Sequence, residues 1–497
     1  MQLYRELTLL GAGLCALAGG PAAAQTTPLP NLAATAPAAA IDSLVPPTAL
    51  TLQEAVELSY RRSPALEAQR LAREAAVAQR KAAWGMRLPQ LGVAASYTYL
   101  SKDIKAFDLN AEKEAALEQL GQLPLPFPIP PQIVQAVRGL DLSLTLQKQQ
   151  FAVVGASAVV PIYMGGRINA AVNAAKIRIE QSDQEAFKAR TDLFAEVVER
   201  YYGLALARQA LRVREEVTAG MRKHLDDARK LEQNGMIAST EKLYAEMFLA
   251  RAEGEQEAAA LQIETVNRAL GTSLCQEADY RPVTELFVVE TLQPLDWFRQ
   301  RVKQNSPLLK QVELTRRLAG EGVRAARAAF LPEVAAIGAV NAWDWQLTEL
   351  APRWMVGAGI KLRIFDGLSS EYKHAAAKKQ VQQVEVMQAK AEEDLMTLTE
   401  KLYNQLRSAE AEVRALGASV EFAASYLDAK QRAFSEGMAP SSEVVDARLN
   451  LAKARIERLA AACAFDVTLA RLLALAGETE TFGSYASMPG YRTVDND

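Results

Sequence analysis

The chain is an internal duplication, and this constrains its fold more than any other feature. Ser63-Pro64 precedes Leu88-Pro89 by the same spacing with which Ser306-Pro307 precedes Leu331-Pro332. Two further pairs of matching runs, 162–165 with 364–367 and 234–236 with 436–438, share a single offset along the chain. A repeated supersecondary unit of this size predicts a pseudo-symmetric structure built from two equivalent halves.

Each half contains strand-like segments with one apolar face. From Leu91 to Tyr99 apolar residues alternate with small or polar ones, which is the period-two pattern of a strand. Residues 354–364 alternate in the same way and place Lys361 and Arg363 on the opposite face. Strands of about ten residues tipped with Trp or Tyr are typical of a transmembrane barrel, although a half-buried soluble sheet shows the same alternation.

Very long helices follow these strands. Residues 166–233 and 368–435 form two proline-free stretches of equal length, each ending at a polar residue and a glycine, Gly235 or Gly437. At a rise of about 1.5 Å per residue each helix would span roughly 100 Å. Their Ala content and apolar residues three and four apart favour lateral, coiled-coil packing. Helices returning over 236–270 and 438–475 are predicted after the two glycines.

The ends of the chain differ in composition from the repeats. Residues 1–24 have a basic start, a short apolar run and Ala22-Ala23-Ala24 before Gln25, which predicts a secretory signal peptide. The alternative, a membrane anchor, needs a longer apolar run. Residues 25–50 form a Pro- and Ala-rich arm, and no later apolar run long enough to span a membrane is expected. The predicted divisions are then a first repeat over 51–280, a second over 281–477 and a tail over 478–497.

Residues that match between the two halves are 243 positions apart before the strand pairs and only 202 positions apart after them. The first strand pair and its connection are therefore longer than the second. The excess, within residues 101–147, contains a charged helical piece at 110–120 and a proline-dense run at 123–131. Prolines at this density favour an extended polyproline conformation. Two interpretations remain open: an external lid over the mouth of a barrel, or a disordered surface loop.

No motif for catalysis is found in the sequence. Both histidines, His224 and His374, lie among charged helical residues and are expected to be solvent-exposed. No His/Cys cluster has metal-ligand spacing, and no Gly-rich nucleotide motif is present. A net charge of −3 gives no sign of a nucleic-acid partner. The sequence therefore predicts a protein without enzymatic activity, cofactor or metal.

The order of these motifs resembles the TolC-like outer-membrane factor (outer membrane efflux protein) family over about residues 50–477. The matching runs are Leu52-Gln53-Glu54-Ala55 before Ser63-Pro64, the two Leu-Pro junctions, Tyr163-Met164-Gly165-Gly166, and Gly437 followed by Val445-Asp446-Ala447-Arg448. Each match is short, but all of them occur in order, behind a signal peptide.

The resemblance implies a mainly α fold with a transmembrane β-barrel contribution. Each repeat would be helix, strand, strand, long helix and returning helix. Four strands are too few for a barrel, so the chain must oligomerise. In the family, three chains form a 12-stranded barrel in the outer membrane, continued by an α-helical tunnel through the periplasm. The implied function is the exit duct of a tripartite efflux pump or type I secretion system, with a periplasmic adaptor and an inner-membrane transporter as partners.

The resemblance also implies roles for residues near the two glycine turns. Glu443 and Asp446 align with the family's constricting acids and would form a ring of six carboxylates in a trimer. The alternative is that these acids only offset the helix dipole. The predicted periplasmic tip, where the adaptor docks, comprises Gly235, Thr240, Glu241, Phe434 and Gly437.

The sequence departs from the family's pattern at Ala439, where a basic residue usually latches the tip. How the tip is held without that residue stays open, as do the exported substrate and the choice between efflux and protein secretion. The alternative from another class is a periplasmic coiled-coil adaptor or scaffold protein. Such adaptors usually have a single helical hairpin, so the duplication argues against this alternative.

Overall fold

The computed structural model describes residues 48–122 and 129–492. The predicted signal peptide, nearly all of the arm at 25–50 and most of the proline-dense run lie outside the described residues. The first helices are α1 (Leu52–Arg62) and α2 (Pro64–Gly85), and their counterparts in the second half are α7 (Leu295–Asn305) and α8 (Pro307–Arg327). Helices α2 and α8 each begin with a proline, which suits a first helical position because no N–H is needed there.

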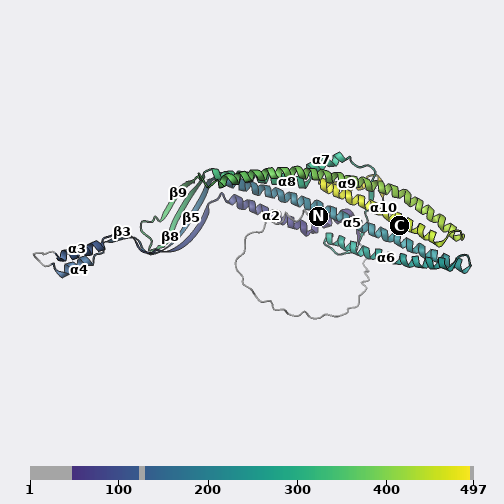
Figure 1. The fold of residues 1–497 in the computed structure, drawn as a ribbon, viewed down its shortest axis with the longest axis horizontal. Coiled ribbons are helices and arrows are strands. Elements are labelled where there is room, and N and C mark those ends of the chain that lie inside the picture. Colours follow the sequence, from purple (N-terminus) through teal and green to yellow (C-terminus); the bar gives the residue numbers. More distant parts are fainter. Residues whose placement is uncertain (1–47, 123–128, 493–497) are drawn as a thin grey trace, which may run out of the picture. The chain divides into compact units, whose positions relative to one another are not determined.

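The long helices are α5 (Arg167–Gln233) and α9 (Ser369–Ser435), each of 67 residues (Figure 1). Their return helices are α6 (Ser239–Leu274) and α10 (Ser441–Ala476). Gly235 and Gly437 are left-handed, with φ of +72° and +74°. The residue after each glycine donates its N–H to a carbonyl five positions back, which completes the Schellman end of each long helix.

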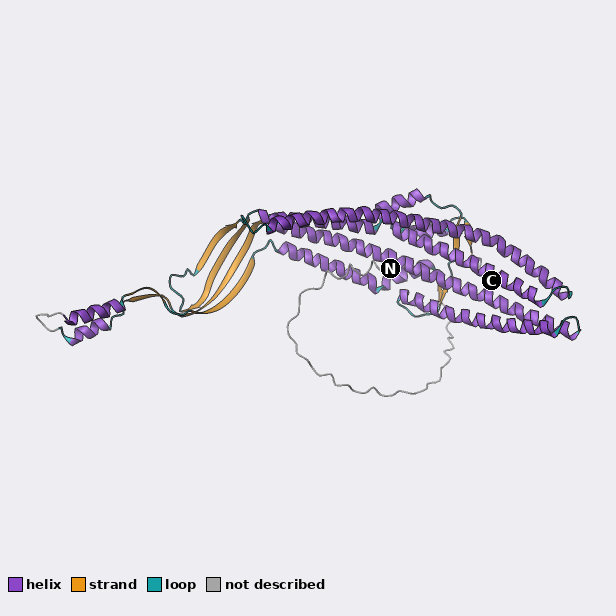
Figure 2. Ribbon diagram, viewed as in Figure 1, coloured by secondary structure: helices purple, strands orange, loops and turns teal. Residues whose placement is uncertain are grey.

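Four strands form one antiparallel sheet. They are β2 (Gln90–Tyr99), β5 (Gln150–Met164), β8 (Glu333–Trp345) and β9 (Trp354–Lys361), in the order β2-β5-β8-β9 (Figure 2). Helices α2, α5, α8 and α9 pack as neighbours in the same order, because each strand continues into its own helix. The predicted strand at 354–364 extends beyond the observed end of β9. The last pair of the two strands is Lys361 with Glu333. On the partner strand Glu333 is preceded by Pro332, which has no N–H to donate, so the pairing ends there.

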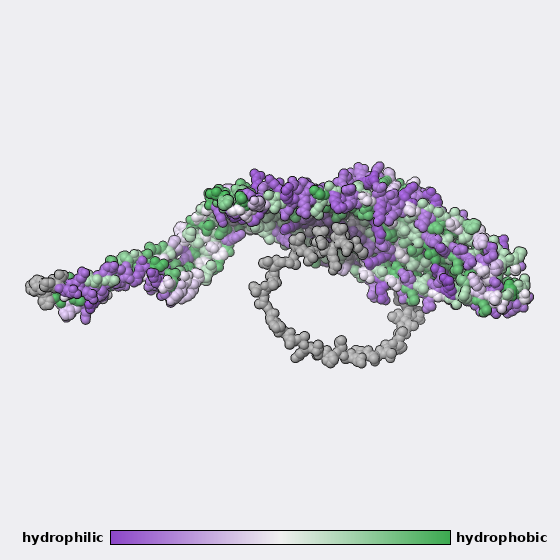
Figure 3. All heavy atoms as spheres, in the orientation of Figure 1, coloured by the Kyte–Doolittle hydropathy of each residue, from purple (hydrophilic) through white to green (hydrophobic). Residues whose placement is uncertain are grey.

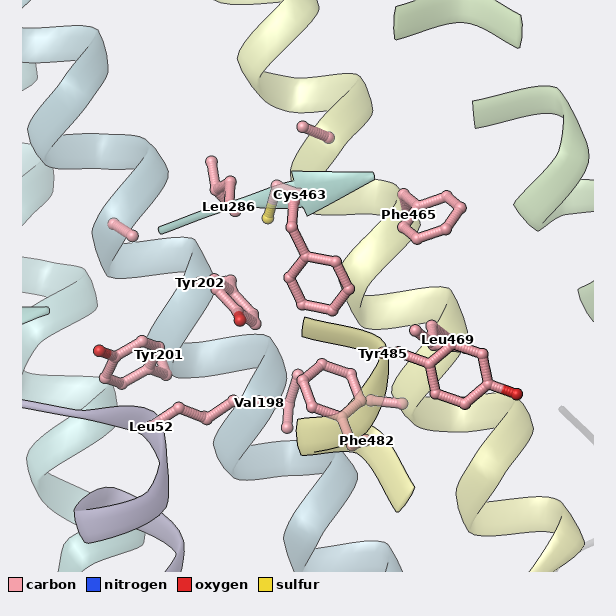
Figure 4. Packing of buried hydrophobic residues seen from close by; sticks show 14 of the residues in the cluster. Leu52, Val198, Tyr201, Tyr202, Leu286, Cys463, Phe465, Leu469, Phe482 and Tyr485 are labelled. Atoms are coloured by element: carbon pink, nitrogen blue, oxygen red, sulfur yellow. The ribbon is translucent and has the colours of Figure 1, made fainter. Parts of the chain in front are cut away.

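Two pairs of short strands connect the ends of each half. Strand β1 (Thr48–Leu50) pairs in parallel with β6 (Tyr280–Pro282), and β7 (Phe287–Val289) pairs antiparallel with β10 (Gly490–Arg492). The C-terminal segment also forms η2 (Thr479–Thr481) and α11 (Phe482–Ala486). In Figure 4, Phe482 and Tyr485 of α11 lie in the main core, and the ring of Phe482 packs against that of Tyr202 of α5. The described part of the C-terminal segment, up to residue 492, therefore packs against the core.

The hydroxyl of Tyr201 connects helix α5 to strand β1 and to the residues that follow strand β6. It donates to the carbonyl of Leu50 at 2.7 Å and accepts the backbone N–H groups of Val283 and Thr284 at 3.1 and 2.9 Å. Tyr201 is fully buried, so the four polar groups satisfy one another in place of water.

Helix α10 is more apolar than expected. Contrary to the sequence expectation, it contains an 18-residue window with a mean hydropathy of 1.8, enough to cross a membrane by length and composition. Within the structure 67% of that window is buried, where α10 packs between α9 and α5. Its apolar character is that of a core helix.

The extra segment of the first half folds as a ribbon carrying two helices. Strand β3 (Ile104–Asp108) pairs with β4 (Ser143–Gln147), and between them lie α3 (Asn110–Gln122) and α4 (Pro131–Arg138). The predicted helix at 110–120 is confirmed, whereas β3, β4 and α4 were not predicted. The ribbon is a separate two-stranded sheet and adds no strand to the four-stranded one.

The junctions between strand and long helix keep their geometry in both halves. Gly165 and Gly166 have φ of +61° and +85°, and their counterparts in the second half, Gly367 and Leu368, have +69° and +64°. A Cβ on Gly165 would lie 2.6 Å from the carbonyl oxygen of Ala328, whereas a Cβ on Gly166 would meet no atom within 4 Å. Only the first of these two glycines is required by close packing.

This difference predicts unequal effects of two alanine substitutions. Gly165→Ala should destabilise the fold by about 1–3 kcal/mol more than Gly166→Ala, because only Gly165→Ala adds overpacking against the η1 turn (Ala328–Phe330). Both variants carry the cost of a left-handed alanine, so the comparison isolates the clash. Thermal unfolding of purified protein, followed by helical circular dichroism, measures it. Equal melting temperatures for the two variants would contradict this packing.

Candidate channel-forming sites

The hydrogen-bond register places the two predicted apolar faces on one side of the sheet. Val356 of β9 pairs with Gly338 of β8. Gly338 pairs with Ala158 of β5, and Ala158 pairs with Leu91 of β2. Directly paired residues project to the same face, so Leu91 and Val356, predicted separately in the two halves, share one surface.

Aromatic residues gather on this same face. By the same register it carries Tyr97, Tyr99, Trp343, Trp345 and Trp354 towards the strand ends farthest from the helices. In the single chain Val356 is 77% exposed and Trp354 70% exposed. Figure 3 shows hydrophobic and neutral surface over much of the sheet, and hydrophilic surface along α8 and α9.

The opposite face carries small and polar residues together with a few apolar ones, such as Val159 and Ile337. The pairs on that face include Gly92 with Ser157, Ser96 with Val153, and Lys361 with Glu333. An apolar band edged by aromatic residues on one face, with polar residues on the other, is the pattern of strands between lipid and an aqueous lumen.

Both outer edges of the sheet are open. Among the described residues β2 pairs only with β5, and β9 pairs only with β8. Each outer strand therefore presents a row of backbone N–H and C=O groups without strand partners. In hydrocarbon every such group must be satisfied within protein, because no water is available.

The two glycine turns lie against each other at the tip. A Cβ on Gly437 would lie 3.8 Å from the methyl group of Met236 in the other turn. The Glu241 carboxylate accepts the backbone N–H of Ser441 at 2.7 Å, which connects the start of α6 to the start of α10. A carboxylate at a helix N-terminus satisfies an orphan N–H group and offsets the positive end of the helix dipole. The structure thus holds the tip together without a basic residue at Ala439.

His224 is part of this contact, and the expectation that it is solvent-exposed was wrong. It is only 5% exposed. Its Nε2 lies 2.6 Å from the Ser441 hydroxyl oxygen, and its ring centroid is 4.5 Å from that of Phe434. Its neighbours in sequence are charged, but His224 follows buried Val217 and Met221 at spacings of seven and three. That helical stripe was the available signal. The expectation for His374 holds only in part, because this residue is half-buried against Phe330.

Burial also sets the charge state of this histidine. It lowers the pKa of His224 from 6.5 to about 4, and the positive charge of Arg448 acts in the same direction, against a smaller opposing effect of Asp227. Arg448 itself was missed as a site residue. Its guanidinium lies over Gly220 of α5, where a Cβ would collide with it. At neutral pH His224 is therefore an uncharged hydrogen-bonding group inside the tip.

The predicted constriction residues lie in different environments. Glu443 forms an ion pair with Lys430 of α9 at 2.5 Å, and this hydrogen bond raises the pKa of Lys430. Asp446, one turn further along α10, is exposed and has no salt-bridge partner among the described residues. Thr240, the second residue of α6, is also exposed. The structure brings Glu241, Phe434 and Gly437 together at the tip, and leaves Asp446 and Thr240 on its surface.

A family comparison decides what this combination of sheet and helices is. The model of the outer membrane efflux protein family matches residues 55–275 and 298–478, one match for each half. The chain belongs to the outer membrane efflux protein family. It is accordingly an outer-membrane protein that extends into the periplasm.

Solved structures show the same fold. The chain resembles the outer membrane protein VceC from Vibrio cholerae with a TM-score of 0.65, 17% identity and coverage of 86% of this chain and 96% of that one. The Neisseria gonorrhoeae MtrE outer membrane channel in its open state matches with a TM-score of 0.65 and 18% identity, over 86% of this chain and 89% of MtrE. CusC, whose structures describe folding and transmembrane channel formation, matches with a TM-score of 0.69 and 16% identity, over 86% of this chain and 91% of CusC. The fold is that of an outer-membrane channel subunit, as the sequence predicted.

A curated relative aligns over part of the chain. Protein CyaE from Bordetella pertussis is 26% identical over 263 residues, which cover 50% of this chain and 54% of CyaE. The alignment thus spans about half the length of the relative.

The buried histidine predicts a pH dependence of the tip. Because the unfolded state has a pKa near 6.5 and the folded state one of about 4, the unfolded state binds more protons between these values. Stability at the tip should therefore fall as the pH falls from about 6.5 to 4. His224→Gln, which keeps a hydrogen-bonding group towards Ser441, should flatten this dependence. Hydrogen exchange at the α5–α6 and α9–α10 turns measures the effect.

The matched control is His374→Gln, since His374 lies on α9 far from the tip turns in sequence. It should leave the pH dependence of exchange at the tip unchanged. A His224→Gln variant whose turns open with the same pH profile as the wild type would show that another group titrates there.

Proposed function

We propose that three copies of this chain form one outer-membrane channel, each contributing β2, β5, β8 and β9 to a 12-stranded barrel. The open edges of the sheet carry this proposal. The four strands alternate in direction, so β9 of one copy runs antiparallel to β2 of the next, and closure leaves no edge in lipid. Channels of this family are homotrimers, which sets the number of copies at three.

The helices continue this barrel as a duct into the periplasm. The packing order of α2, α5, α8 and α9 repeats the strand order, so closing the sheet also closes a ring of helices. We assign the duct to a tripartite machine with a periplasmic adaptor and an inner-membrane transporter, as members of the family work. It passes substrates outward without a reaction of its own, and either an efflux pump or a secretion system would use it in this way. A periplasmic adaptor or scaffold would not need the aromatic-edged sheet.

The tip is the proposed resting gate and the adaptor-docking end. Gly235, Thr240, Glu241, Phe434 and Gly437 form or flank its turns, and Glu443 and Asp446 follow in α10. In a trimer, six carboxylates would approach one axis. Because Lys430 neutralises Glu443 within each chain, Asp446 is the stronger contributor to a negative ring. Such a ring attracts cations in a confined opening.

The orientation of the strands can be tested with a matched pair of substitutions. Ile360→Arg places a charge on the aromatic-edged face, where it would meet hydrocarbon at a cost of about 2–4 kcal/mol near the midplane. Gly359→Arg places the same charge on the opposite face. Outer-membrane insertion should fall sharply for Ile360→Arg and much less for Gly359→Arg. Equal insertion of both variants, measured by membrane fractionation, would contradict this assignment of faces.

The gate is tested by removing its charges. The double variant Glu443→Gln and Asp446→Asn should lower the preference for cations over anions in planar bilayers and weaken block by multivalent cations, because the negative ring is lost. The single variant Asp446→Asn should account for most of the change. The difference from wild type should shrink at high salt, where the Debye length falls from about 10 Å at 0.1 M to about 3 Å at 1 M.

Glu257 and Glu264 provide the control. Both are exposed on α6, away from the turn, and neither forms a salt bridge among the described residues. Glu257→Gln with Glu264→Gln removes the same charge and should change selectivity little. Wild-type selectivity and block in the tip variant would show that these acids only stabilise the start of α10.

A further inference from the structure

The ribbon formed by β3 and β4 is amphipathic, and its apolar face is uncovered. Phe107 pairs with Leu144, and the N–H of Leu109 donates to the carbonyl of Leu142. These four side chains project to one face and are 40–50% exposed. The other face carries polar residues, including the pair Asp108 and Ser143. A two-stranded ribbon is marginally stable alone, so this face is expected to pack against something.

Polar contacts give the helical end of the ribbon a defined structure. The Asn110 side chain donates to Asp141 at 2.8 Å and accepts the N–H of Leu142 at 2.9 Å. The Lys113 ammonium donates to the carbonyls of Arg138 and Leu140, which cap the end of α4. These bonds fix the turn from ribbon to helices. The segment is therefore an ordered element, which argues against the disordered-loop interpretation for its described residues.

The base of the ribbon is fixed to the four-stranded sheet. The Gln147 amide donates to the carbonyl of Gln346 at 2.8 Å and accepts the N–H of Thr348 at 2.8 Å, so it clamps the ribbon to the β8–β9 loop. The N–H of Leu100 donates to the carbonyl of Gln149 at 2.7 Å, directly beyond the last pair of β2 and β5. The ribbon thus leaves the sheet at the aromatic ends of β2 and β5.

We propose that the apolar faces of three ribbons pack against one another and form a cap over the external mouth of the channel. This proposal rests on the proposed trimer. Strand β2 is the edge that meets the next copy, so the ribbon that follows it emerges beside the boundary between subunits. Because the three identical ribbons are tethered around one axis, their effective concentration is high. Even a weak contact between them would therefore be formed most of the time.

The chemistry of the ribbon favours a second copy over lipid as the partner of this face. The ribbon carries Lys105, Asp108 and Asp141 within a few residues of the apolar side chains, and α3 adds further acids. A small apolar face bordered by charges fits a self-complementary contact about a symmetry axis, where each copy covers its neighbour. A cap of this kind would restrict the outer mouth in addition to the gate at the tip.

Cross-linking at two neighbouring positions tests the cap. A Cys275→Ser background removes the native thiol that is exposed among the described residues. In this background Leu144→Cys places a thiol on the apolar face and Thr145→Cys places one on the opposite face. A short bismaleimide applied to membranes should join Leu144→Cys subunits into dimers and leave Thr145→Cys subunits mostly monomeric on denaturing gels. Native mass spectrometry of the same samples reports whether the trimer is present.

A second variant gives a functional readout that needs no cross-linker. Phe107→Asn with Leu144→Asn should keep the trimer and raise single-channel conductance, because the cap no longer closes. Trimers whose Leu144→Cys subunits do not cross-link, or in which a bimane label on Leu144→Cys is quenched by brominated lipid, would overturn the cap and leave the proposed channel intact. Absence of trimers in the wild type would instead overturn the proposed function.

Discussion

The satisfaction of backbone hydrogen bonds in lipid is the constraint on which this structure depends. A four-stranded sheet with one hydrophobic, aromatic-edged face belongs in a membrane, but its two outer strands leave their polar edges open. Within one chain these unpaired backbone groups cannot bond to one another, because β2 and β9 form opposite edges of the sheet. Closure with further copies removes it, and the alternating strand directions make every copy's edges complementary to its neighbours.

The duplication extends this solution from the membrane into the periplasm. Each strand continues into a helix, so the order of strands fixes the order of helices, and the left-handed junctions at Gly165–Gly166 and Gly367–Leu368 set the same transition in both halves. The halves differ at the two places to which we assign a role in gating. The first carries the ribbon at the outer end, and the second supplies the acids of α10. At the tip, Glu241 and His224 both bind Ser441, which joins the two halves through one residue.

Local patterns predicted the elements whose signals lie within the chain segment itself. The 67-residue helices, the glycine turns and the alternating face of β9 followed from periodicity, proline and glycine alone. The missed features depend on contacts between distant segments. Strands β1, β6, β7 and β10 are very short and exist because each pairs with a strand far away in the sequence. His224 was misjudged because its charged sequence neighbours outweighed the helical stripe that buries it.

The number of copies in the purified channel tests the central claim most directly. Native mass spectrometry of the protein extracted from outer membranes in mild detergent gives this number without assuming a function. A single species of three chains, which dissociates only when the barrel unfolds, is the result that closure between β9 and β2 predicts. A folded, membrane-inserted monomer would contradict the account, because its sheet edges would then have to be satisfied within one chain.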